Sequence, residues 1–471
     1  MMASNMDSAI QNPEPGLLAT HALAADPSAI VPCANVPEQW HRSRLLLYAR
    51  LIENFIDVWP EEIYRETFVD CGPALGNAIV LNEPKEISRI FRDRSERWSV
   101  AWQQQRICRS LFGGETIATA TGSAWAADRH HYEAALAEPT LVELTGYLHR
   151  NARQLASRLL ARGASGPINS EVARYSLKGI AAIGMSWRED RFLDEFADEM
   201  WSAYDTIGRV SVRSFFRFAG LLPTGSQGRG DRVARKLRHR ITEEIGARKR
   251  DQTSRQDLLQ FYLDSGGRGT DTIPNMLALL SSGYDTTSAA LSWHLYILGQ
   301  LPDLQQRLRT ELAGLFDEAG RFDEKKFREL VVTRAVFREI VRLYPSLPLL
   351  ARVCRQGDEV CGRRIEPGRT VFVSPYVLHR HRKHWRDPGQ FDASRFMPGS
   401  ASKPVEGAYI PFGVGKRSCP GFRFAYREIV VALAVLLGSC RLVTDTGRPV
   451  RLRSGLGLGT FDGLHVDVQP L

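Results

Sequence analysis

One ten-residue loop near the C-terminus constrains this chain more than any other segment. Residues 412–421 read FGVGKRSCPG, so a single cysteine, Cys419, stands among glycines directly before an apolar stretch. Glycine lacks a Cβ atom, and the backbone can therefore turn sharply here and lie close to a flat group. A helix from about Phe422 to Leu437 places its unpaired first-turn N–H groups beside the sulfur, which favours the anionic thiolate. The pattern predicts a cysteine ligand at the start of a buried helix.

The spacing of this loop is specific. It fits F-x-x-G-x-R-x-C-x-G at every fixed position, whereas a lone cysteine in a glycine-rich loop is usually just a small buried residue. The loop resembles the haem-binding loop of the cytochrome P-450 family. The resemblance implies haem b (iron protoporphyrin IX) as the cofactor and Cys419 as the axial ligand of its iron. It also implies that the loop contacts haem through Phe412, Gly413, Arg417 and Gly421.

A second polar group interrupts an otherwise apolar helix, which we predict from about Thr272 or Pro274 to Gly299. The centre of this helix, residues 282–287, reads SGYDTT. An acid and two threonines are costly in an apolar helix unless they have partners. The residues alone leave two interpretations open, because Asp285 can face solvent while the threonines bond back to carbonyls one turn earlier.

The cysteine loop favours the functional interpretation of this helix. The segment is similar to the family's oxygen-activating motif A/G-G-x-D/E-T-T, from which only Ser282 departs. The resemblance implies that Thr286 holds a water molecule at the oxygen site and that Asp285 relays protons.

Further matches are spread along the chain. Glu339 and Arg342 resemble the family's E-x-x-R pair, and Arg395 stands where a second arginine completes that structural clamp. Taken alone, a Glu and an Arg three residues apart are a common surface helix pair. The resemblance implies a role for these three residues in folding and haem retention.

Two more segments resemble haem-contacting parts of the family. Trp125 and Arg129 match W-x-x-x-R, the motif of a helix that meets the haem propionates, although this spacing also suits a stacked pair on a surface helix. Arg352 falls where another propionate-binding arginine is expected, and Arg355 is the neighbouring alternative.

Helical patterns dominate the chain to about Leu343. Short β-branched segments lie near residues 67–81, 347–353 and 370–374. We therefore predict a mainly α fold with a minor β region, which the resemblance narrows to the cytochrome P-450 fold. Residues 36–471 are expected to form a single large haem-centred catalytic domain, preceded by a poorly ordered tail at residues 1–35.

Composition excludes some partners and places. The formal charge of +9 is concentrated near residues 234–250, but acids interrupt that stretch at helical spacing, which favours a solvated helix over nucleic-acid binding. Seven scattered cysteines show no paired framework, and the N-terminus lacks the features of a signal peptide or membrane anchor. We expect a soluble cytoplasmic protein without a membrane anchor.

The resemblance implies a monooxygenase that inserts one atom of O2 into a hydrophobic small molecule. Electrons would come from a separate ferredoxin or flavodoxin with its reductase, and the basic residues Lys416, Arg423 and Arg427 would form the docking face. Two alternatives stay open: a donor-independent isomerase, dehydratase or peroxygenase, and a non-catalytic haem-binding or ligand-binding protein. By analogy, the pocket draws on residues 103–120, 276–282, 347–351 and 455–463.

Overall fold

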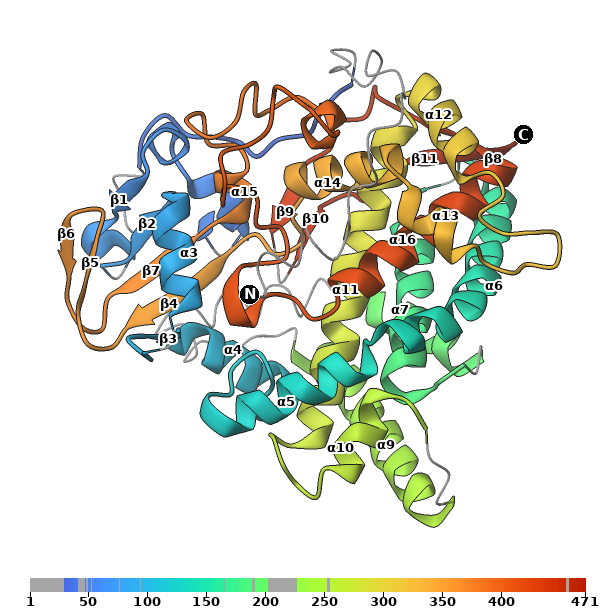
Figure 1. Ribbon diagram of the computed structural model, residues 1–471, viewed down its shortest axis with the longest axis horizontal. Coiled ribbons are helices and arrows are strands. Elements are labelled where there is room, and N and C mark those ends of the chain that lie inside the picture. Colours follow the sequence, from blue (N-terminus) through green and yellow to red (C-terminus); the bar gives the residue numbers. More distant parts are fainter. Residues whose placement is uncertain are drawn as a thin grey trace.

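Helices fill most of the molecule, and a smaller β region lies at one end (Figure 1). The structure, a computed structural model, describes residues 29–40, 47, 50–51, 53–75, 77–93, 95–164, 166–188, 191–201, 227–251, 255–454 and 457–471. The predicted fold class, mainly α with a minor β region, is confirmed. Most of the predicted tail, residues 1–35, lies outside the described residues.

The helices vary from single turns to long spans that cross the molecule. Residues 191–201 are helical as well. The α-helices are α3 (Pro84–Arg92), α4 (Trp102–Phe112), α5 (Gly122–Ala135), α6 (Glu138–Arg162), α7 (Asn169–Met185), α9 (Gln227–Asp251), α10 (Leu258–Asp264), α11 (Thr272–Leu298), α12 (Pro302–Leu312), α13 (Glu324–Glu329), α14 (Val332–Leu343), α15 (Pro375–Leu378) and α16 (Phe422–Ser439). The 3-10 turns are η2 (Phe55–Val58), η3 (Glu61–Tyr64), η4 (Gly72–Leu75), η6 (Ala393–Phe396) and η7 (Gly415–Arg417).

One mixed sheet carries most of the β structure. Its strand order is β1-β2-β7-β4-β3, in which β2 and β7 pair in parallel and the other neighbours are antiparallel. Three two-stranded pairs accompany it: β5 with β6, β8 with β11, and β9 with β10. The strands are β1 (Phe68–Asp70), β2 (Ile79–Leu81), β3 (Trp98–Val100), β4 (Leu350–Cys354), β5 (Asp358–Val360), β6 (Arg363–Ile365), β7 (Thr370–Val373), β8 (Cys440–Thr444), β9 (Leu452–Ser454), β10 (Leu458–Thr460) and β11 (Val466–Pro470).

The helix α11 runs through the centre of the helical region and packs against α7, α14 and α16 (Figure 1). It begins at Thr272, as predicted, with Asp271 at the N-cap position, although the Asp271 side chain makes no capping hydrogen bond. Its apolar residues are buried on nearly all sides, which is typical of a core helix. The polar residues in the middle of α11 differ in burial: Thr287 is buried, Asp285 and Thr286 are half-buried, and Ser282 is exposed.

The contact between α7 and α11 is unusually close at one glycine. A Cβ atom on Gly283 would lie 2.9 Å from Cβ of Ile180 and closer still to the rest of that side chain. Only glycine lets the two helices approach to this distance without displacing the isoleucine. The glycine of the predicted oxygen-activating motif therefore has a packing reason in this fold.

The basic stretch predicted as a solvated helix lies in α9, and one of its arginines is not solvated. Arg248 is buried and forms ion pairs with Glu244 at 2.9 Å and with Asp257 at 2.6 Å. These two carboxylates neutralise the guanidinium inside the protein. Among the described helices, none combines the length and the apolar composition needed to cross a membrane.

Candidate active site

The cysteine loop folds back on itself before α16 begins. The Cys419 amide donates a hydrogen bond to the carbonyl of Phe412 at 2.8 Å, and the Ser418 amide donates to that of Gly415 at 3.0 Å. Gly421 is the N-cap residue of α16, which begins at Phe422. The loop and the helix start thus hold the sulfur in the position that the sequence pattern predicts.

A glycine of this loop lies directly against α3. Gly415 has a φ of +78°, and a Cβ atom there would lie 2.2 Å from the carbonyl oxygen of Phe91. This position requires glycine for two reasons. The backbone is left-handed there, and the α3 main chain leaves no room for a Cβ atom. The glycine therefore fixes how closely the loop approaches the C-terminal end of α3.

The surroundings of Cys419 shift the pKa of its thiol in two opposite directions. Although Cys419 keeps part of its accessible surface, it lies deep in the protein, and this burial raises the pKa of the thiol. The Gly421 N–H and then the Arg129 guanidinium lower that pKa by smaller amounts. The net direction is opposite to the sequence expectation, because loss of hydration outweighs the helix start. Coordination of a metal ion deprotonates a thiol outright.

Two arginines lie side by side near this loop. Burial and, to a smaller extent, the charge of the neighbouring Arg417 lower the pKa of Arg352 to about 10. Arg417 donates to the carbonyl of Ala120 at 2.5 Å, whereas Arg352 lies over the ring of Phe91 at 4.3 Å. Among the described residues, neither guanidinium has a carboxylate partner in hydrogen-bond or ion-pair contact.

These two arginines fit the group that the resemblance implies. Unpaired buried cations are costly, and the two carboxylates of a haem would neutralise them. The alternative Arg355 is exposed and bonds to the hydroxyl of Ser99 at 2.8 Å instead. The geometry therefore favours Arg352 over Arg355 as the second propionate partner.

The helix α5 brings its predicted pair to the same place. The Arg129 guanidinium donates to the carbonyl of Ser418, next to Cys419, at 2.6 Å and pairs with Glu133 at 2.7 Å. The ring of Trp125 faces Arg417, whose Cζ atom lies 4.9 Å from the ring centroid. Trp125 and Arg129 thus act together on the cysteine loop, although they lie about 290 residues away from it in sequence.

On α11 the acid and the alcohol make different contacts. The Thr286 hydroxyl donates to the carbonyl of Ser282 at 2.6 Å, one turn earlier in the helix. Asp285 lies close to Gly457 in the C-terminal segment. A Cβ atom added to Gly457 would be 2.5 Å from Oδ2 of Asp285. The Ser282 hydroxyl donates to the carbonyl of Leu279 at 3.2 Å. Thr286 therefore bonds back to a carbonyl one turn earlier, which is one of the two interpretations that the sequence allowed. Its hydroxyl oxygen can still accept a hydrogen bond.

One contact of this helix was not predicted from the sequence. The Ser346 hydroxyl donates to the main-chain carbonyl of Thr286 at 2.8 Å, and the carbonyl of Ser346 accepts from the Leu458 amide at 2.9 Å. Ser346 lies in the turn between α14 and β4. No periodicity or motif distinguishes a serine in such a proline-flanked turn, so sequence reasoning had no signal for it.

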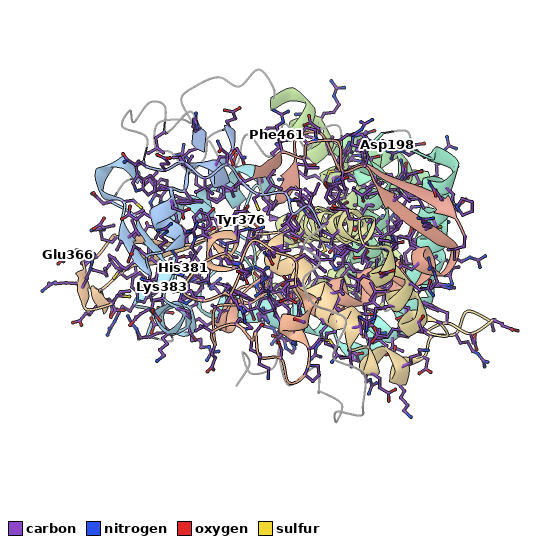
Figure 2. All side chains as sticks on the ribbon, turned by 90° about the horizontal axis from the view of Figure 1, so that it is seen from above. Asp198, Glu366, Tyr376, His381, Lys383 and Phe461 are labelled. Atoms are coloured by element: carbon purple, nitrogen blue, oxygen red, sulfur yellow. The ribbon has the colours of Figure 1, made fainter. Side chains whose placement is uncertain are left out.

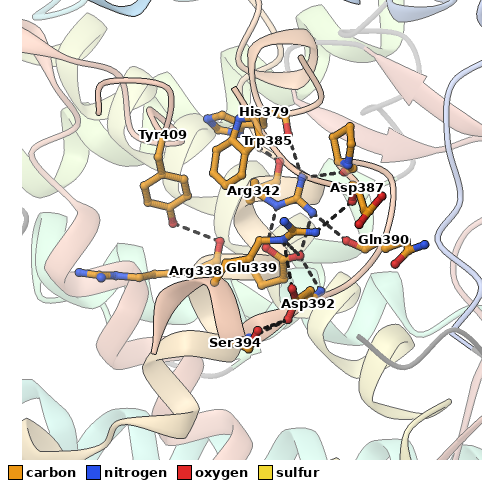
Figure 3. A network of polar contacts seen from close by, with 12 residues as sticks. Arg338, Glu339, Arg342, His379, Trp385, Asp387, Gln390, Asp392, Ser394 and Tyr409 are labelled. Carbon is orange, nitrogen blue, oxygen red and sulfur yellow. Dashed lines mark hydrogen bonds and ion pairs between the residues drawn. The ribbon is translucent and has the colours of Figure 1, made fainter. Parts of the chain in front are cut away.

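The three clamp residues meet in the interior, and Figure 3 labels two of them, Glu339 and Arg342. Arg342 pairs with Glu339 at 2.7 Å, and both side chains are fully buried. Arg395 approaches the same carboxylate at 3.5 Å. Arg342 also donates to the carbonyls of His379, Pro388 and Gln390, so the pair ties α14 to the segment before η6.

The surface beside the loop differs from the expected basic face. Lys416 and Arg423 are exposed. Arg427 is buried and pairs with Glu138 at 2.6 Å and with Glu324 at 2.5 Å. The prediction that Arg427 belongs to a surface patch is wrong, because α6 and α13 cover this face of α16.

Taken together, the thiol at a helix start, the two unpaired guanidiniums and the acid and alcohol on α11 define a site suited to a cysteine-ligated haem. The profile of the cytochrome P-450 family matches residues 68–460 of the chain. The chain therefore belongs to the cytochrome P-450 family, which implies a haem cofactor.

Individual relatives match over shorter lengths. Cyclooctatin synthase of Streptomyces melanosporofaciens is 32% identical over 246 residues, which cover 50% of this chain and 53% of that protein. Pentalenene oxygenase of Streptomyces avermitilis is 29% identical over 267 residues, or 55% of this chain and 59% of that protein. Cytochrome P-450 4V2 of Rattus norvegicus is 30% identical over 268 residues, or 52% and 51%. The aligned regions thus span about half the length of these relatives.

Proposed function

We propose that this protein is a haem-thiolate monooxygenase that inserts one atom of O2 into a hydrophobic small molecule. The observation that carries the proposal is that Arg352 and Arg417 lie next to each other at the Cys419 loop without a described carboxylate partner. Arg352 is buried and Arg417 is partly buried, so an anionic group between them would be stabilised. Haem b supplies two carboxylates and an iron for the thiolate. Phe412, Gly413 and Gly421 form the rest of the cradle, and Arg129 supports the loop through Ser418.

When bound, the haem supplies oxygen activation, which a cysteine thiolate promotes by donating electron density to the iron. The protein supplies positions and protons. Thr286 is held by Ser282 through its hydroxyl proton, so its oxygen accepts a hydrogen bond from a water molecule. Asp285, on the same turn of α11, passes protons towards that water. This division of roles assigns both residues to proton delivery.

The proposed substrate is hydrophobic because the surrounding segments are. Leu277, Leu280 and Leu458 are buried, and apolar side chains dominate the walls of small-molecule sites. We propose a ferredoxin-type or flavodoxin-type electron donor with its reductase, and a cytoplasmic location, which the seven free cysteines support. Pentalenene oxygenase, by its name, acts on pentalenene, and a ligand screen by shift of the ferric Soret band would identify the substrate of this chain.

The central test combines a spectrum with turnover. The reduced protein with carbon monoxide should show the absorption band characteristic of thiolate ligation, and Cys419→Ala should lose it. Cys354→Ala is the matched control, because Cys354 is also a free, buried cysteine. If Cys419→Ala kept the thiolate band, the ligand assignment would be wrong.

Turnover separates the remaining alternatives. A monooxygenase should form product only with NAD(P)H, a ferredoxin or flavodoxin and its reductase. Product without any electron donor would instead indicate an isomerase, a dehydratase or a peroxide-using enzyme. A thiolate spectrum and tight ligand binding without product under either condition would indicate a binding protein.

A further inference from the structure

A second buried cation lies outside the haem site. Arg380 follows α15 and is only 6% exposed. Its Nε atom and both of its Nη atoms have no hydrogen-bond partner among the described residues. A buried charge without a partner is strongly unfavourable, so a guanidinium with three unsatisfied nitrogens requires an acceptor from somewhere.

Aromatic rings form two walls around this guanidinium. Its Cζ atom lies 3.9 Å from the ring centroid of Tyr376 and 5.9 Å from that of Tyr344. The Tyr344 ring in turn stacks on Trp293 of α11 at 3.7 Å, which holds it in place. Cation–π contact stabilises the charge, but a ring face accepts no strong hydrogen bond from the edge of the guanidinium. Figure 2 labels Tyr376, which marks this cluster in the interior.

The hydroxyl groups of three tyrosines, Tyr64, Tyr344 and Tyr376, add further hydrogen-bond donors near Arg380. The hydroxyls of Tyr344 and of Tyr64, in η3, are buried and have no partner among the described residues. The Tyr376 hydroxyl accepts from the Ala34 amide at 2.8 Å, so its proton remains to be donated. Burial raises the pKa of Tyr376 to about 12, and the phenol therefore stays protonated at neutral pH.

The described carboxylates do not satisfy these donors. Arg380 takes part in no ion pair with a described Asp or Glu, and its electrostatic neighbours are the three tyrosines and Cys33. Asp57 influences Tyr64 and Tyr376, but its oxygens already accept from the Asn35 amide and the Asn54 side chain. The cluster thus combines one positive charge with several donors and lacks an acceptor.

We propose that Arg380, with the hydroxyls of Tyr64, Tyr344 and Tyr376, forms a buried binding site for one small monovalent anion of the halide class. A single charge matches the single guanidinium, and a spherical ion accepts from donors in several directions at once. Water is a poorer match, because each water molecule brings two donors to a cluster that already has too many.

This anion would join three segments that are distant in sequence. Tyr64 lies in η3, Tyr344 directly follows α14, and Tyr376 and Arg380 lie within and just after α15. None of the four residues belongs to the proposed catalytic site. The expected effect is therefore on stability, with the haem spectrum unchanged.

Thermal unfolding of the full-length, haem-loaded protein tests the site in solution. Chloride or bromide would replace gluconate at constant ionic strength, since gluconate is too large to be buried there. A specific site predicts a rise in Tm that begins at a defined halide concentration and then follows its logarithm. Tyr344→Phe and Tyr64→Phe each remove one donor to a charged ligand, and each should raise the required halide concentration about tenfold.

Matched variants and a crystal decide the outcome. Tyr426→Phe removes another buried hydroxyl without a partner among the described residues, and should leave the halide dependence unchanged. Crystals grown with bromide should show an anomalous peak between Arg380 and the phenols. A water molecule or a side-chain carboxylate at that position would overturn the proposal. The proposal would also fail if halide did not raise the Tm in solution. It would fail as well if Tyr344→Phe and Tyr64→Phe changed the halide dependence no more than Tyr426→Phe does.

Discussion

The Ser346 hydroxyl donates to the main-chain carbonyl of Thr286, although the two residues are 60 positions apart. The oxygens are 2.8 Å apart. Through the Leu458 amide, which donates to the Ser346 carbonyl, the contact also reaches β10. The turn after α14 therefore holds the segment of α11 on which the proposed proton delivery depends.

Ser346→Ala should weaken the coupling of electron consumption to product formation. The substitution removes one hydrogen bond, which costs about 1 kcal/mol of stability, and frees the Thr286 carbonyl to move. We expect less product per NAD(P)H with normal substrate binding. Ser374→Ala is the control, since it loses a similar bond of 2.8 Å to the carbonyl of Pro348 together with the capping bond from the Val377 amide, and neither of these bonds involves α11. Equal coupling in both variants would contradict a positioning role for Ser346.

Thr286→Ala should divert electrons to peroxide or water. Because the alcohol is proposed to act only on protons, the carbon monoxide spectrum and substrate affinity should stay near wild type, while product per NAD(P)H falls by roughly tenfold or more. Asp285→Asn should act in the same direction. Thr242→Ala, which removes the same kind of back-bond on α9, should change nothing. An unchanged ratio in the two α11 variants would contradict the proposed roles of Asp285 and Thr286 in proton delivery.

The buried ion pair of Arg427 predicts a stability effect. Glu324→Gln leaves the guanidinium with Glu138 as its remaining carboxylate partner and should cost roughly 3 kcal/mol of the free energy of unfolding, because the charge stays buried. Arg448→Gln breaks an exposed pair with Asp445 and should cost less than about 1 kcal/mol. Chemical denaturation of the haem-loaded proteins measures both. Equal costs would show that burial does not strengthen the pair.

The exposed cations predict salt-dependent electron transfer. Reversing Lys416 and Arg423 to glutamate should slow reduction by an acidic donor more at low than at high ionic strength, because rim charges steer association. Lys249→Glu with Arg250→Glu makes the same change in net charge on α9 and should have little effect. Stopped-flow reduction measures the rates. A slowing that is independent of salt would argue against steering.

Glu428 predicts a pH dependence of stability. It is fully buried on α16, and loss of hydration raises its carboxyl pKa well above the usual value, which favours the neutral form in the folded protein. In the unfolded chain it ionises near pH 4.3. Above that pH the folded state binds one proton more than the unfolded state, and stability falls by about 1.4 kcal/mol per pH unit up to the folded-state pKa.

Glu428→Gln should remove this slope. The stability gained by the variant relative to wild type should therefore be smallest below pH 4 and should grow between pH 5 and pH 7. Glu318→Gln, at an exposed position, serves as the control. Parallel stability curves for wild type and Glu428→Gln would show that Glu428 is ionised in the folded protein.

Local sequence was sufficient wherever the backbone itself carries the signal. The cysteine loop, the apolar α16 and the start of α11 at Thr272 depend on glycine freedom, helix periodicity and capping positions within a few residues. The fold class followed from the same patterns. The family motifs named Glu339, Arg342 and Arg395 as a set, but the burial that makes Glu339 and Arg342 a paired core element belongs to the folded chain.

Only the tertiary structure determined which charged side chains are buried and which residues they contact. Arg423 and Arg427 are four residues apart on one helix, yet only the first is exposed, because α6 and α13 bring Glu138 and Glu324 to the second. The choice of Arg352 over Arg355 depends on which side chain points towards Arg417. A sequence specifies the charge of a residue, but only the packing of distant segments determines its hydration and its partners, and these set its energetic role.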